Sequence, residues 1–140
     1  MINKHHVVGI VGSRRRNHGN DYNLVVDAFW QLAENSKWDN ENIIICSGRC
    51  PQGADKFAQQ IAYDYPGNPI AYMDFPAMWE IYGKSAGYRR NCYIARTSDY
   101  LIACVAEDRE GGTEHTIKQF LNKIQMSEGQ AVRAGLLILV

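Results

Sequence analysis

The chain has 140 residues, 46% of them hydrophobic, which is enough for one domain with a buried core and too little for two. Its 15 Lys and Arg residues equal its 15 Asp and Glu residues, and this zero net charge disfavours a protein that coats DNA or RNA. No apolar run approaches the roughly 18 residues of a membrane span, and no secretory segment opens the chain. We therefore expect one domain over residues 1–140, a cytoplasmic location, and neither a membrane nor a nucleic-acid partner.

Strand and helix patterns alternate along the chain. Short apolar runs predict strands at about 7–11, 43–46, 68–73, 99–105 and 136–140, and apolar residues at helical spacing predict helices at about 21–34, 53–64, 87–98 and 113–125. This alternation is typical of a parallel sheet with right-handed crossovers and helices on both faces. The predicted fold class is α/β, a Rossmann-like three-layer sandwich around a mostly parallel five-stranded sheet.

The four cysteines predict no metal site. Cys46 and Cys104 lie in apolar strand runs, where a free cysteine behaves as a small hydrophobe. Cys50 follows Cys46 closely, but no second pair with metal-ligand spacing is present. We expect reduced thiols, no metal ion and no resident cofactor.

Three glycine-containing turns follow predicted strands and give the main functional signal. They are Gly12-Ser13-Arg14, Ser47-Gly48 with Gly53-Ala54-Asp55, and Glu110-Gly111-Gly112-Thr113. Glycines before a helix let a phosphate approach free backbone N–H groups and the positive end of the helix dipole, and the Thr113 hydroxyl either caps the helix or binds the same phosphate. Parallel strands bring such turns to one edge of the sheet, where ligands bind. Ordinary strand-to-helix turns are the alternative.

Residues 74–93 interrupt the alternation with aromatic and basic residues. Trp79 and Tyr82 are expected to cover a base, and Arg90 to bind phosphate, with Asn91 orienting a sugar or amide. The aromatic pair could instead cover one end of the core. The basic run 14–18 either binds a second phosphate or is a solvated loop, and Asp55 either holds a ribose hydroxyl or caps its helix.

In this order the motifs resemble those of the SLOG superfamily, the Rossmann-like group that includes the LOG phosphoribohydrolases and DprA, and most of all its small YspA/YpsA-like branch. The resemblance spans about residues 7–120. It rests on the three turns, Trp79, Tyr82-Gly83-Lys84, Ala86-Gly87, Arg90-Asn91 and Ser98-Asp99. It implies a nucleotide-derived ligand in the crevice, and often self-association, so a homo-oligomer is expected.

One departure from the LOG enzymes bears on catalysis. Those enzymes carry a glutamate two positions after the threonine of the glycine motif, where this chain has His115. Glu114 is one residue away and would point elsewhere on the helix. The expected function is therefore binding of a nucleotide or nucleotide-derived ligand, for sensing or sequestration. The alternative is a nucleotide N-glycosidase with Arg90 and either Glu114 or His115 as catalytic residues.

Overall fold

A computed structural model describes residues 5–64 and 70–140. Its strands are β1 (His6–Gly12), β2 (Ile43–Ser47), β3 (Ala71–Asp74), β4 (Tyr100–Cys104) and β5 (Leu137–Leu139). Its helices are α1 (Gly19–Ser36), α2 (Ala54–Tyr63), α3 (Trp79–Tyr82), α4 (Ala86–Thr97), α5 (Gly112–Ile124) and α6 (Glu128–Arg133). Two short 3-10 turns, η1 (Asn40–Asn42) and η2 (Gly83–Ser85), complete the list.

The five strands form one sheet in the order β3-β2-β1-β4-β5, and every pairing is parallel. The chain builds outward from β1 to β3 and then returns to the other side of β1 to add β4 and β5. Strand order therefore reverses between β1 and β4, the place where open α/β sheets bind ligands. This confirms the predicted α/β, Rossmann-like sandwich, and the sheet is wholly parallel.

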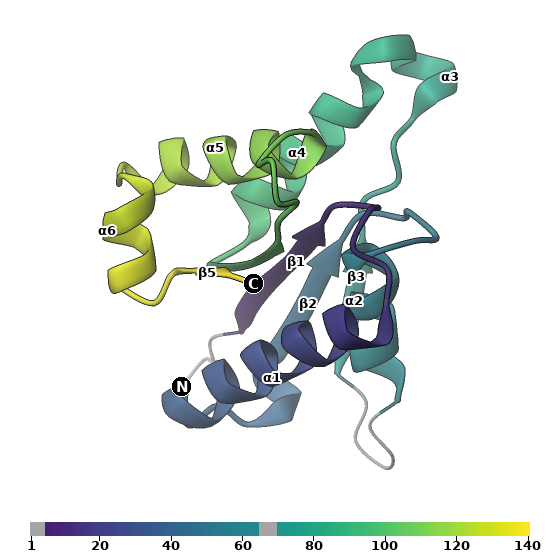
Figure 1. Cartoon of the computed structure of the whole chain (residues 1–140). Helices are drawn as coiled ribbons and strands as arrows, with labels where there is room; N and C mark the ends of the chain where they lie inside the picture. The colour runs from purple at the N-terminus through teal and green to yellow at the C-terminus, as the bar shows by residue number, and fades with distance from the viewer. Residues whose placement is uncertain (1–4, 65–69) are drawn as a thin grey trace.

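Helices cover both faces of the sheet, as Figure 1 shows. Alternate residues of β1 point to opposite faces. Val8 and Ile10 join Phe29 of α1 and the apolar residues of α2 in one core, whereas Val11 joins the second core, where Phe120 of α5 packs with residues of α4. Burial of apolar side chains on both faces is what holds the three layers together.

The predicted elements are confirmed with shifts of one or two residues at most ends, and their type is correct throughout. Residues 68 and 69 of the third predicted strand lie outside the described residues, and β3 begins at Ala71. Two short helices were not predicted. The second of them, α6, begins at a capping box in which Ser127 and Gln130 bond to each other's backbone N–H groups, a sequence signal that was available.

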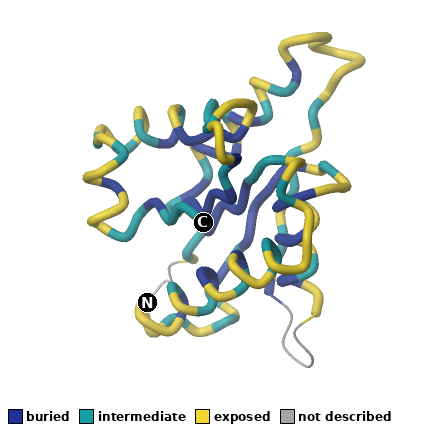
Figure 2. The backbone as a smooth tube through the Cα atoms, in the orientation of Figure 1, coloured by how far each residue is buried: buried dark blue, intermediate teal, exposed yellow. Residues whose placement is uncertain are grey.

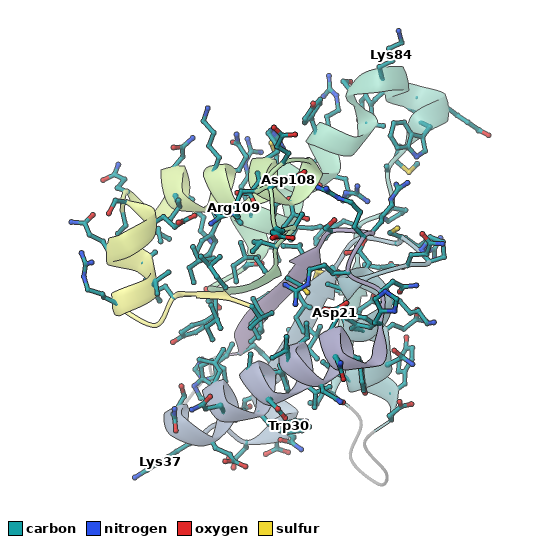
Figure 3. All side chains as sticks on the ribbon, in the orientation of Figure 1. Asp21, Trp30, Lys37, Lys84, Asp108 and Arg109 are labelled. Carbon is teal, nitrogen blue, oxygen red and sulfur yellow. The ribbon has the colours of Figure 1, made fainter. Side chains whose placement is uncertain are left out.

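The other unpredicted helix, α3, lies on an arm that leaves the sheet. The arm consists of residues 76–85, and Figure 1 shows its outer end well away from the strands. Most of its backbone is exposed in Figure 2, and Lys84 points from its outer end in Figure 3. Trp79 and Ile81 keep 57% and 66% of their surface exposed, so the arm presents apolar side chains that the single chain does not bury.

Among the described residues, no helix has the length and apolar character that crossing a membrane requires. All four cysteines are free, with Cys46 and Cys104 buried in the strands where the sequence placed them. Burial raises the pKa of the Cys46 thiol to about 11, although a contact with Ser98 opposes the shift.

The close approach of β1 to α2 predicts that one methyl group added at Gly12 destabilises the fold. A Cβ at Gly12 would lie 2.7 Å from Ala54 Cβ and 2.8 Å from Cys104 Cβ, inside van der Waals contact. We expect Gly12→Ala to lower the free energy of unfolding by about 1–3 kcal/mol. Gly19→Ala is the control, since a Cβ there meets nothing within 4 Å. Urea unfolding compares the two, and a Gly12→Ala variant as stable as the parent would contradict this packing.

Candidate functional site

A cavity of about 340 Å³ opens at the carboxyl ends of β1 and β4, beside the reversal of strand order. Its volume lies in the usual range for small-ligand sites. The candidate site residues on its wall are Gly12, Ser13, Arg14, Asp55, Arg90, Asn91, Gly111, Gly112 and Thr113. The structure thus brings together residues from all three glycine turns and from α4.

The third turn supplies the free backbone N–H groups. Gly111, with φ of +118°, is the residue before α5, a conformation that favours glycine. The first N–H groups of α5 have no partner within the helix and face the cavity with the positive end of its dipole. The expectation that Thr113 caps this helix is wrong, because Gly111 holds the cap position and Thr113 lies inside the first turn.

The first turn supplies a cation rather than backbone donors. The N–H of Ser13 donates to the carbonyl of Cys104 at 2.9 Å, which extends the β1–β4 ladder and removes that donor from the cavity. Arg14 lies exposed on the cavity wall and forms no hydrogen bond or ion pair with any other described residue. Its guanidinium is therefore free to meet an anion.

The other two arginines of the basic run are structural. Arg15 forms a bidentate pair with Asp108, each bond 2.7 Å, which links this turn to the loop before α5; Figure 3 labels Asp108 there. Arg16 pairs with Asp21 at 2.9 Å and donates to two backbone carbonyls, those of Val105 and Val140. The run is thus neither one phosphate grip nor a free solvated loop.

The second turn contributes Asp55 to the cavity. Its carboxyl accepts the Cys50 N–H at 3.1 Å and contacts the buried Ser47 hydroxyl at 2.8 Å. Ser47 and Gly53 do not line the cavity, and the N–H of Gly53 donates to Asn17 Oδ1 at 2.7 Å. Gly48 borders an adjoining hollow on the other side of Asp55. Gly53, not Asp55, precedes α2 as its cap residue.

A hydrogen-bond chain fixes the α4 side of the cavity. Arg90 Nε donates to Asn91 Oδ1 at 2.9 Å, and Asn91 Nδ2 donates to the Gly112 carbonyl at 3.2 Å. Asn91 therefore ties α4 to the first turn of α5 and orients the Arg90 side chain. Its buried amide is committed to protein partners, so it serves to position Arg90 in addition to any contact with a sugar.

The two residues considered for glycosidic cleavage lie off the cavity wall. Glu114 points away from the cavity, as its helical position predicted, and pairs with Arg109 through two hydrogen bonds of 2.9 Å. His115 Nδ1 lies 3.3 Å from Asn91 Nδ2, and its ring packs edge-on against Tyr88. Burial and the nearby Lys118 charge lower the pKa of His115, which keeps the ring neutral near pH 7. Neither side chain is positioned to act in the cavity.

Trp79 and Tyr82 also do not reach this cavity. Both belong to the arm, where Tyr82 packs under the Arg89 guanidinium and keeps 39% of its surface exposed. They do not cover the end of the core either. The sequence predicts aromatic residues near the ligand because no local pattern shows that residues 76–85 leave the body of the fold.

Four wall residues were not predicted from the sequence: Val11, Cys50, Ile94 and Thr116. Arg15 and Glu110 also lie on the wall, and the sequence named them only within the basic run and the third turn. Thr116 had a detectable signal, because it follows Thr113 by three residues and so shares one helix face. Its hydroxyl donates to the Gly112 carbonyl at 3.3 Å. Within residues 5–64 and 70–140, no cluster of three His, Cys, Asp or Glu side chains is arranged to hold a metal ion.

Comparison with known proteins adds a fold likeness. No family model and no curated protein sequence matches this chain. One solved structure, described as "Function and structure of the molybdenum cofactor carrier protein MCP from Chlamydomonas reinhardtii", superimposes with a TM-score of 0.57 at 16% identity. The match covers 98% of this chain and 90% of that chain. At this identity the likeness shows a shared Rossmann-like α/β fold.

Proposed function

We propose that this protein binds a nucleotide or nucleotide-derived ligand through its phosphate, in the cavity between β1 and β4. The observation that carries the proposal is the convergence of free N–H groups at the start of α5 with the guanidinium groups of Arg14 and Arg90 around one cavity. Backbone donors and a helix dipole on one side, with arginines on the other, are the groups that bind a phosphate.

The neighbour of similar fold supports a carrier or binding role at the coarser level. That protein is described as a molybdenum cofactor carrier, a protein that binds a small molecule. We extend to this chain only the class of function, binding of a small ligand. The nucleotide and the SLOG family assignment, in its YspA/YpsA-like branch, rest on the ordered motifs of the sequence, and both are part of this proposal.

Binding without turnover fits the site better than catalysis. A glycosidase needs a group that activates water or protonates the leaving base within hydrogen-bond reach of its target. Glu114 is held by Arg109, and His115 is turned toward Asn91 and Tyr88. The N-glycosidase alternative retains Arg90 as a candidate, but neither Glu114 nor His115 lies beside it on the cavity wall. Free thiols are what a reducing compartment maintains, which supports a cytoplasmic location.

The first test removes the cavity's α4 cation. We expect Arg90→Ala to weaken binding of adenosine monophosphate or ADP-ribose by about 1.5–3 kcal/mol, roughly 10- to 150-fold, because a charge-assisted hydrogen bond to phosphate is lost. Arg89→Ala is the matched control, since Arg89 packs on Tyr82 of the arm and not in the cavity. Calorimetry on folded variants that gave equal affinities for parent and Arg90→Ala would remove Arg90 from the site.

A second test separates binding from cleavage. The protein is incubated with adenosine monophosphate, NAD and ADP-ribose, and free base is measured by chromatography. We expect no release near the rate of about 1 per second at which working enzymes turn over. Release at that rate, abolished by His115→Ala or Glu114→Gln, would establish the glycosidase function instead.

We also propose that copies of the chain associate, as the SLOG resemblance implies, and that the arm forms the interface. Trp79 and Ile81 are exposed there, and an interface would bury them. Sedimentation is expected to show a dimer or larger species for the parent, and a monomer for Trp79→Ser with Ile81→Ser. Val132→Ser, at an exposed position on α6, is the control. A parent that sediments as a monomer at all concentrations would refute self-association.

A further inference from the structure

Ser47 occupies a position where its hydroxyl meets two oxygen atoms. The residue is fully buried at the end of β2. Its Oγ lies within hydrogen-bond distance of the Ile10 carbonyl oxygen and 2.8 Å from Asp55 Oδ1. The hydroxyl carries one hydrogen, whereas a carbonyl and an ionised carboxylate are both acceptors without a hydrogen of their own.

The number of available hydrogens decides which group donates the second hydrogen bond. If Ser47 donates to Ile10, its contact with Asp55 is a hydrogen bond only when Asp55 is the donor. If Ser47 donates to an ionised Asp55, the Ile10 carbonyl faces a lone pair inside the fold, which costs the free energy of an unmade buried hydrogen bond. The other carboxyl oxygen, Oδ2, is already an acceptor for the Cys50 N–H at 3.1 Å. Only a proton on Oδ1 satisfies every contact.

We propose that Asp55 is a neutral carboxylic acid in the folded protein near pH 7 and donates its proton to Ser47. As a neutral group on the cavity wall it does not cancel the charges of Arg14 and Arg90, so the cavity selects anions. Ionisation of Asp55 would place a negative charge beside the bound anion. Anion binding is therefore linked to the proton on Asp55. This second part rests on the proposed function, whereas the protonation itself does not.

Burial of Asp55 favours the neutral acid, whereas its polar and charged neighbours favour the carboxylate. Burial raises the pKa of the Asp55 carboxyl, while hydrogen bonds from the Ser47 hydroxyl and the Cys50 and Gly48 N–H groups, and the charge of Arg90 on α4, oppose the rise without cancelling it. Arg49 after β2, Lys56 on α2 and Tyr72 on β3 border the hollow on the other side of Asp55. No ion pair joins Asp55 to Arg90 in the described part of the chain, so the nearest guanidinium does not neutralise a carboxylate directly.

Gly48 keeps the acid and the guanidinium near each other. A Cβ at this position would lie 2.6 Å from Asp55 Oδ2 and 2.8 Å from Arg90 Nη1. A side chain would therefore displace one group or the other. The missing Cβ lets Asp55 lie close enough to an anion on Arg90 for its charge to matter.

The protonation is tested on the protein alone with Asp55→Asn. An asparagine side chain can donate to Ser47 and accept from Cys50, as the neutral acid does. We expect the variant to be at least as stable as the parent at pH 7. Since the folded pKa of Asp55 is raised, ionising it in the fold costs stability as pH rises, so the variant's advantage in melting temperature grows from about pH 4 upward.

Asp21→Asn is the matched control, for which the expected change in stability has the opposite sign. Burial of Asp21 opposes ionisation, but hydrogen bonds from the His18 N–H and Arg16 lower its pKa overall. Its substitution should destabilise the protein at pH 7, with the deficit shrinking below about pH 4. An Asp55→Asn variant less stable than the parent at pH 7 would overturn the proposal. Should it fail to fold, the carbon-13 shift of the Asp55 carboxyl in the parent decides, with a carboxylate value at pH 7 overturning it.

The linkage is tested with sulfate, an anion whose charge is constant from pH 6.5 to 9. Its affinity is read from the amide signals of Gly112 and Thr113. We expect the parent's affinity to fall across this range, by up to about tenfold per pH unit, and that of Asp55→Asn to stay constant. Parallel pH profiles for both proteins would overturn the linkage. No sulfate binding by either protein would count against the proposed anion site, while the stability test still judges the proton on Asp55.

Discussion

Parallel pairing of β1 with β4 is the constraint on which the site depends. It forces the chain to return across the sheet after β3, so that α1 and α2 cover one face while α4 and α5 cover the other. The two helix layers diverge at the carboxyl ends of these strands, which leaves a crevice. The Ser13 N–H bond to Cys104 extends this pairing into the first turn and fixes where Arg14 begins.

The fold could be predicted because it follows from patterns among residues that are close together in the sequence. Alternating apolar runs and helical stripes identify a parallel sandwich without reference to any distant contact, as the burial of Val8, Ile10 and Phe120 illustrates. The edge at which the glycine turns meet follows from the same reasoning. Most of the candidate residues lie on one cavity wall for this reason alone.

The roles of individual residues could not be predicted, because they depend on which partner each polar group finds in three dimensions. Ser13 and Gly53 have their N–H groups bonded inside the protein, and the three arginines of the basic run separate into one free and two paired side chains. Arg15 and Asp108 are 93 residues apart in sequence, so no local pattern connects them. The departure of the arm from the sheet is likewise a tertiary property, and it moves Trp79 away from the cavity.

A phosphate bound against the first turn of α5, between Arg14 and Arg90, is the central prediction. The most direct measurement is a crystal structure of the protein with adenosine monophosphate. We predict the phosphate within hydrogen-bond distance of the Gly112 and Thr113 N–H groups and of at least one of the two guanidinium groups. A nucleotide bound on the arm, at the opposite edge of the sheet, or with its phosphate away from α5 would contradict the account.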